Sequence, residues 1–150
     1  MLIAQLVFTT MKEYLPQDFR PKNDTQIHKM DSAYVWCEDG IFFIHSMPDI
    51  DHTLEHAKRQ FEFYRNTCLS EIVPRLPMIC DVRIARPIKK EVRDFYSSKF
   101  VGNHTTKFAF LVDSPVSMVI ANFFISVQRL SVPVRMFTKP NDAIIWCKQN

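Results

Sequence analysis

The chain has 150 residues, of which 47% are hydrophobic, and a formal net charge of +3 at pH 7. This length suits one domain, which would bury roughly two thirds of the surface of the unfolded chain. Because the charge is small and Lys and Arg are scattered, nucleic acid and anionic membranes are not expected as partners. The chain contains only two glycines, Gly40 and Gly102. Loops that cradle phosphates need several glycines, so Walker-type and dinucleotide-binding loops are excluded and no cofactor is predicted.

The four cysteines are far apart in the chain, each beside apolar residues and none in a CxxC pair: Cys37, Cys68, Cys80 and Cys147. This spacing favours four buried free thiols in a reducing compartment. The first residues lack a basic segment, and their apolar run is too short for a signal peptide or a membrane span. We therefore predict a cytoplasmic protein with no membrane span.

Residues 1–25 are predicted to form a poorly anchored or partly extended arm ahead of a domain at residues 26–150. Residues 1–8 are apolar and could form a strand, whereas the polar stretch after them carries Pro16 and Pro21. Met11 is an alternative start, which would make residues 1–10 extraneous.

Two β-rich runs within residues 27–47 are separated by Asp39-Gly40, the strongest short signal for a hairpin. Residues 51–68 follow as an amphipathic helix, because Leu54, Ala57 and Phe61 recur every three or four residues. The apolar run at residues 75–82 then indicates a short strand that is buried on both faces.

The second half continues with alternating helices and strands. Pro87 suits the first turn of a helix, and residues 106–113 form the next strand. Ser114 and Pro115 are typical of an N-cap and first helical residue for a helix over 115–130. A strand at 132–137 and a helix at 140–147 close the chain. The order β-β-α-β-α-β-α-β-α predicts an α/β fold with one mixed sheet and helices packed on it.

The stretch "HTLEH", from His52 to His56, matches the HxxEH pattern of inverted zinc proteases. At 100° per residue, however, the apolar stripe of this helix centres on Leu54, Ala57 and Phe61, nearly opposite the two histidines. A catalytic zinc needs a third ligand and a dry cavity. We therefore predict that both histidines face water and that no metal is bound.

Polar residues that follow consecutive strands match those of a response-regulator receiver. They are Asp49, Asp51, Asp81, Ser114 and Lys139. A receiver carries a further strand and helix between its acidic pair and its phosphoacceptor, and it lacks the hairpin before them. Strand ends are polar in any α/β domain. A phosphoacceptor at Asp81 is therefore the third of the functions that we consider.

The hairpin, Cys80-Asp81 at a strand end, the run "ANFFISVQRLSVPVRMFT" and the tail "NDAIIWC" resemble SpoIIAA-like or STAS-like domains of bacteria, including small members described as STAS/SEC14 domain proteins. The resemblance covers about four fifths of the chain and implies a SpoIIAA/STAS-like fold. Regulatory STAS proteins carry a phosphorylatable Ser or Thr in the turn after the strand that ends here at Asp81. Residues 82–87 read VRIARP, so that phospho-switch is absent.

Asp81 is expected to accept hydrogen bonds from nearby backbone amides or to pair with Arg83 or Arg86. Several basic residues follow Asp81 in the sequence, at the strand end and on the outer face of the next helix. Their first interpretation is a solubilising surface, and their second is a site for an anion or an acidic partner. The second interpretation rests on Arg83, Arg86, Lys89 and Lys90.

The helix at 115–130 shows two apolar faces. One is predicted to face the core and consists of Val116, Ile120, Phe123, Val127 and Leu130. The opposite face consists of Met118, Ala121 and Ile125. Because exposed apolar patches tend to mark interfaces, this second face indicates a symmetric dimer, a protein partner or coverage by the N-terminal arm, and we predict a homodimer.

These observations favour a non-catalytic module for protein interaction or regulation, a class that comes from the family resemblance. The alternative is a carrier of a small apolar ligand, as SEC14-type relatives imply. Its cavity would be lined by Phe95, Phe108, Phe110, Phe123 and Phe124. An enzyme ranks below both, since no nucleophile and base pair is evident on an inward face.

Overall fold

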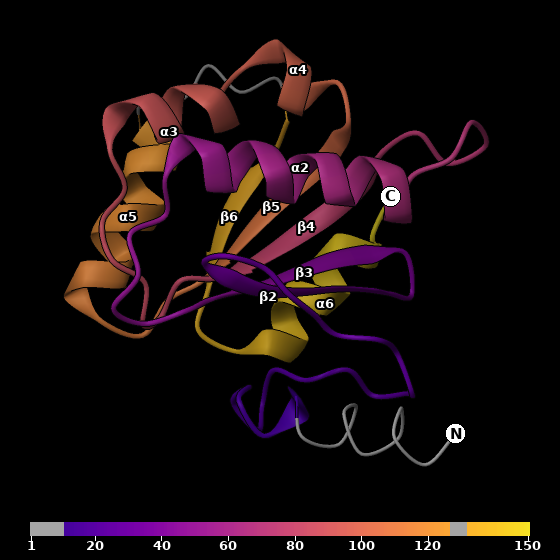
Figure 1. Cartoon of the computed structure of the whole chain (residues 1–150), viewed down its shortest axis with the longest axis horizontal. Coiled ribbons are helices and arrows are strands. Elements are labelled where there is room, and N and C mark those ends of the chain that lie inside the picture. Colours follow the sequence, from indigo (N-terminus) through magenta and orange to yellow (C-terminus); the bar gives the residue numbers. More distant parts are fainter. Residues whose placement is uncertain (1–10, 127–131) are drawn as a thin grey trace.

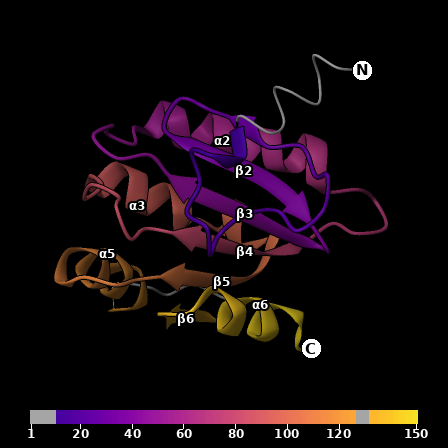
Figure 2. The same ribbon diagram turned by 90° about the horizontal axis from the view of Figure 1, so that it is seen from below.

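The computed structural model describes residues 11–126 and 132–150; the side chains of residues 123–126 are not described. Its centre is a mixed sheet of six strands whose spatial order is the same as their order in the sequence. Figure 2 shows the labelled strands β2 to β6 in that succession. The strands are β1 (His28–Lys29), β2 (Ala33–Glu38), β3 (Ile41–Ser46), β4 (Leu76–Asp81), β5 (Thr105–Leu111) and β6 (Val134–Phe137).

The first three strands are antiparallel neighbours, and β3 to β6 run parallel. Each parallel step passes through helix: α2 (Leu54–Cys68), then α3 (Lys90–Tyr96) with the short α4 (Lys99–Gly102), and then α5 (Pro115–Ser126). Right-handed crossovers that all advance in one direction place these helices on one face of the sheet. The last helix, α6 (Pro140–Lys148), lies on the other face (Figure 1). The predicted order of elements and the α/β class are confirmed.

The hairpin between β2 and β3 forms at the predicted place. Asp39 and Gly40 have φ of 51° and 72°, the positive values that a two-residue type I′ turn requires. The turn fixes the register, in which Glu38 faces Ile41 and Trp36 faces Phe43.

Apolar side chains fill both faces of the sheet. On the face under α2, Phe42, Met78 and Phe108 meet Phe61 and Tyr64. The second face carries another core, in which α6 and the segment before β1 cover the strands. Successive residues of a strand point to opposite faces, so β4 contributes to both cores, as its uninterrupted apolar run predicts. The second core includes Leu15, Phe19, Trp36, Phe43, Ile79, Leu111, Ala143 and Cys147.

The expectation of a poorly anchored arm is wrong for residues 11–25. Leu15 and Phe19 are buried, and the Phe19 ring lies 5.2 Å from Trp36 and 5.7 Å from Phe43. In the sequence, apolar residues spaced among prolines and charges are typical of a segment without tertiary contacts. In the structure, they cover the face of the sheet opposite α2. Residues 1–10 lie outside the described part of the chain.

Helix α5 is rotated relative to the prediction. Ala121, expected on the outer face, is buried together with Ser117 and Ile120. Val116, expected in the core, has 53% of its surface exposed. Ser117 can be buried because its hydroxyl accepts hydrogen bonds from the backbone N–H groups of Asp113 and Ser114, both at 3.0 Å. A count of apolar residues does not detect that inward-facing serine. Met118 is exposed as expected, and the side chain of Ile125 lies outside the described residues.

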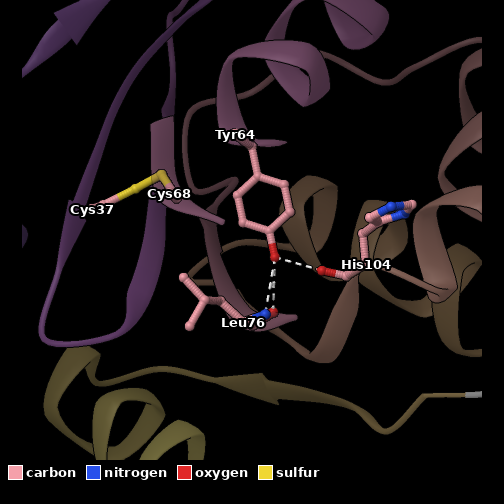
Figure 3. The surroundings of a disulfide bond; sticks show 5 residues. All are labelled: Cys37, Tyr64, Cys68, Leu76 and His104. Carbon is pink, nitrogen blue, oxygen red and sulfur yellow. Dashed lines mark hydrogen bonds between the residues drawn. A yellow bond between two sulfur atoms is a disulfide. The ribbon is translucent and has the colours of Figure 1, made fainter. Parts of the chain in front are cut away.

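Two of the four cysteines form a disulfide, which corrects the expectation of four free thiols. Cys37 in β2 is bonded to Cys68 at the end of α2 (Figure 3). Cys80 and Cys147 are free, and burial raises the pKa of each thiol to about 12. Among the described residues, no helix has the length and apolar character needed to cross a bilayer.

Candidate functional site: an apolar cavity with a polar chain

A cavity lies at the carboxyl ends of β3 and β4, between the sheet and the helices that cover it. The space between its walls, which includes open solvent at the mouth, is about 770 Å³. Its walls come from β3, β4, β5, α2, α3 and α5, and from the β1–β2, β3–α2 and β4–α3 connections. Lining residues include Ser32, Ile44, Met47, Ile50, His52, Gln60, Met78, Cys80, Ala85, Arg86, Ile88, Tyr96, Phe108, Phe110 and Ile120.

The floor of the cavity consists of two rows of side chains across the parallel strands. Ile44, Cys80 and Phe110 are in register on β3, β4 and β5. Met78 and Phe108 form the second row, two residues earlier on β4 and β5. Because side chains two apart on a strand share a face, both rows point toward the helices. The strand register therefore supplies a continuous apolar floor.

A chain of hydrogen bonds runs along the wall above this floor. The His52 ring lies between two hydroxyl groups, with Nδ1 2.6 Å from the Ser32 Oγ and Nε2 2.7 Å from the Tyr96 hydroxyl. The Gln60 amide donates to the Tyr96 hydroxyl at 3.3 Å. Ser32 lies in the β1–β2 connection and His52 in the segment before α2. Gln60 belongs to α2 and Tyr96 to α3. All four line the cavity.

His52 is neutral at pH 7. Burial, with a smaller contribution from the neighbouring His56, lowers its pKa to about 4. The prediction that His52 faces water is wrong, because it rested on a helical wheel that included this residue. The helix begins at Leu54, and Thr53 is its N-cap. His56 instead closes the capping box with Thr53.

At the mouth of the cavity, Arg86 lies near two carboxylates. Its guanidinium is 3.3 Å from Asp51 and 3.6 Å from Asp49, and all three side chains are substantially exposed. Such exposed pairs contribute little to stability. They do, however, balance the positive charge of Arg86, so the mouth is not an attractive site for an anion.

Asp81 lies on the other face of the sheet, fully buried. It accepts hydrogen bonds from His45 Nδ1 at 2.8 Å and from the Arg83 side chain at 2.9 and 3.1 Å. Burial alone would raise the pKa of Asp81, but these hydrogen bonds outweigh it and the pKa is lowered. Arg83 also holds both oxygens of Asp18 in the arm, at 2.7 and 2.9 Å, which lowers the pKa of Asp18. The expected pairing of Asp81 with Arg83 is confirmed.

Three of the four basic residues of the expected anion site are already paired with carboxylates. Arg83 is engaged by Asp81 and Asp18, Arg86 by Asp49 and Asp51, and Lys90 by Asp94 at 2.6 Å. Lys89 stands at the N-cap of α3. A site for an anion or an acidic partner at these four residues stays a prediction, and these ion pairs do not favour it.

The receiver-like interpretation of Asp81 is also wrong. A phosphoacceptor must offer an oxygen at the surface, whereas this side chain is enclosed by His45 and Arg83. The strand order also lacks the reversal of the flavodoxin-like order, 2-1-3-4-5. Among the residues that the structure describes, no group of three or more His, Cys, Asp or Glu side chains is placed to hold a metal ion.

Of the phenylalanines expected to line a cavity, Phe108 and Phe110 do so. Phe95 packs edge-on against Phe61 instead. The side chains of Phe123 and Phe124 are not described. Sequence reasoning missed Ser32, His52, Gln60 and Tyr96. A threonine before an apolar periodic run is an N-cap signal, and applied to Thr53 it would have placed His52 outside the helix.

One family model matches residues 35–150, and its description is "Domain of unknown function (DUF7793)". The chain belongs to this family. A crystal structure of an uncharacterized protein from the DUF3478 family, from Shewanella loihica PV-4 and with a SpoIIAA-like fold, is similar at a TM-score of 0.52 and 9% identity, covering 82% of this chain and 91% of that one. The fold is therefore SpoIIAA-like, as the sequence predicts. No curated protein matches the chain.

Proposed function

We propose that the protein is a non-enzymatic binding module that takes up a small, largely apolar molecule in the cavity at the ends of β3 and β4. The observation that supports this most is the cavity itself. Apolar side chains in register on three strands form its floor, and a few polar groups are gathered on one wall. Ligand pockets of proteins commonly have this composition.

Binding without chemistry agrees with the character of the polar groups. Ser32 and His52 are in contact, as a nucleophile and its base would be. A base with a pKa of about 4 takes a proton from a serine hydroxyl inefficiently at neutral pH. The second ring nitrogen of His52 contacts the Tyr96 hydroxyl and not a carboxylate, so an imidazolium would gain little stabilisation there.

The cavity can be tested by filling it. Ala85 lines the cavity and its neighbour Ile84, which is exposed, does not. The neutral fluorescent probe N-phenyl-1-naphthylamine should bind the wild-type protein with its emission enhanced. We expect Ala85→Phe to weaken this binding at least tenfold because the new ring occupies the probe's space, and Ile84→Phe to leave it unchanged.

Fluorescence titration measures these affinities, and thermal unfolding confirms that both variants fold. Absence of probe binding to the wild-type protein, or equal binding to Ala85→Phe, would contradict the proposal. Mass spectrometry of the recovered probe should show it unaltered.

A second candidate function is self-association through α5, which would make the protein an interaction module. The observation in its favour is a set of apolar side chains on the outer face: Val116, Met118 and Val119, the last with 66% of its surface exposed. Exposed apolar patches tend to mark interfaces. The set differs from the predicted one, because Ala121 is buried.

If two copies meet through this face, the wild-type protein should show a dimer mass in light scattering at micromolar concentration. Val119→Asp should reduce it to a monomer, since a buried charge at an apolar interface is costly. Ile72→Asp is the matched control, because Ile72 is also exposed but lies in the loop after α2. A monomeric wild-type mass would exclude self-association in this range.

A further inference from the structure

The hydrogen bonds along the polar wall of the cavity all point the same way, from donor to acceptor. Gln60 donates to the Tyr96 oxygen. The Tyr96 hydroxyl lies 2.7 Å from Nε2 of His52. A phenol O–H is a stronger proton donor than an imidazole N–H, which favours donation from Tyr96 to His52. The neutral ring then carries its hydrogen on Nδ1 and donates it to Ser32 Oγ, 2.6 Å away. The chain runs from Gln60 through Tyr96 and His52 to Ser32.

In this donor order, the Ser32 hydroxyl hydrogen has no acceptor among the other groups of the chain of hydrogen bonds. Three groups, the phenol, the imidazole and the serine, hold three hydrogens, while only two contacts join them. Ser32 is the terminal group and lines the cavity. A hydroxyl whose oxygen already accepts a hydrogen bond is a strengthened donor. The cavity therefore offers one directed hydrogen-bond donor to a molecule inside it.

Charge selects among the molecules that can accept this bond. The polar wall is neutral: the His52 side chain is half-buried, and its ring contacts hydroxyl groups on both sides. Arg86 at the mouth is accompanied by Asp49 and Asp51, so the charge there sums to a negative value. A carboxylate entering an apolar cavity would lose hydration without gaining a cation. A neutral oxygen loses far less.

We propose that the ligand is a neutral, predominantly apolar molecule with one hydroxyl or carbonyl oxygen, which accepts a hydrogen bond from Ser32 at the end of the chain Gln60–Tyr96–His52–Ser32. Its hydrocarbon part lies on the floor formed by Ile44, Met78, Phe108 and Phe110. This inference rests on the proposed function and specifies the chemistry of its ligand. Fatty acids and other anions are excluded from the class by the uncompensated cost of their charge.

The test is competition against N-phenyl-1-naphthylamine at pH 7.5 by 1-octanol, 2-octanone and octanoate, which have equal chain lengths. We expect the alcohol and the ketone to displace the probe at concentrations at least tenfold below octanoate. His52→Phe keeps a ring of similar size but ends the relay. It should weaken the binding of octanol and octanone at least fivefold more than it weakens the binding of the probe. Ser32→Ala should act in the same way.

His56→Gln is the control, because Gln can retain the N3 position of the capping box and the residue lies outside the cavity. Its affinities should equal those of the wild-type protein. If octanoate competes as well as octanol, or if His52→Phe and Ser32→Ala bind octanol normally, the inference is overturned while probe binding still supports a pocket. If the probe itself does not bind, the proposed function fails first.

Discussion

At the scale of single residues, Asp81 shows that one well-placed partner can determine whether a buried carboxylate destabilises the folded protein. An ion taken out of water is costly unless other groups satisfy it. Arg83 does so for Asp81 and also holds Asp18 in the arm, with only 14% of its own side chain exposed. Arg86, three residues later, pairs with aspartates that remain largely in water, and 47% of its side chain is exposed. The two arginines form a natural pair for comparison.

We expect Arg83→Met to lower the free energy of unfolding by about 3–5 kcal/mol, because it leaves the buried Asp81 with His45 as its remaining side-chain hydrogen-bond partner. Arg86→Met should cost at most about 1 kcal/mol, as exposed ion pairs do. Urea unfolding monitored by circular dichroism measures both values. Similar losses in the two variants would show that the buried network does not contribute as its geometry indicates.

The neutral state of His52 predicts how stability depends on pH. Its pKa is about 4 in the folded protein and about 6.5 in an unfolded chain. Between these values the unfolded chain binds a proton that the folded protein does not, so stability falls as pH decreases from 6.5 toward 4. The loss amounts to about 1.4 kcal/mol per pH unit over that window.

His52→Gln removes this titration, so the difference in unfolding free energy between wild type and variant should shrink as pH falls through the window. Ile84→Gln, which changes an exposed residue without a titratable group, is the control and should run parallel to the wild type. Denaturant unfolding at pH 4.5, 5.5, 6.5 and 7.5 measures the differences. Parallel curves for wild type and His52→Gln would mean that the imidazole is not held neutral.

At the scale of elements, α2 is fixed at both ends. Its first turn lies beside the polar chain of the cavity, and its last residue is joined to β2 by the Cys37–Cys68 disulfide. One turn before that bond, the Tyr64 hydroxyl donates to the carbonyl of His104 at 2.6 Å and accepts from the backbone N–H of Leu76 at 3.1 Å (Figure 3). The helix thereby links three strands, since Leu76 begins β4 and Thr105 after His104 begins β5.

Loss of the disulfide should destabilise the protein by about 3–4 kcal/mol, the chain-entropy value for a loop of roughly 30 residues. Cys37→Ser with Cys68→Ser tests this in urea, and Cys147→Ala, which removes a free thiol, is the control. Alkylation of the unfolded protein should modify two cysteines without reductant and four with it. Modification of all four without reductant would show that the bond does not form.

The elements also show where sequence reasoning reaches and where it stops. Asp39-Gly40 identified the hairpin, and the stripe of Ala57 and Phe61 identified α2, because a turn and a periodic face are local properties. The rotation of α5 about its axis could not be predicted from the residues of the helix alone. Ser117 turns inward because it accepts bonds from residues before the helix, and this carries Ala121 to the inside. The disulfide is non-local as well, since its cysteines are separated by 31 positions and nothing in their spacing pairs them.

For the whole molecule, the order of elements was sufficient to predict a single mixed sheet, because right-handed crossovers leave few alternatives. The cavity could not be predicted to the same extent. Its phenylalanines Phe108 and Phe110 were named, but the polar wall comes from four segments that meet only after folding. Two of its members, Ser32 and His52, lie outside regular elements, where periodicity gives no orientation.

The strand order has a consequence for synthesis. From β3 onward every new strand pairs with the one made just before it, so the sheet can be extended at one edge as the polypeptide leaves the ribosome, with few distant segments to bring together. The opposite face is different, since Ile79 and Leu111 there are packed against α6, which follows all six strands in the sequence. A nascent chain that stalls before residue 140 would therefore expose apolar side chains on one face of a sheet whose strands are all present, and we expect such intermediates to be bound by chaperones until α6 has been made.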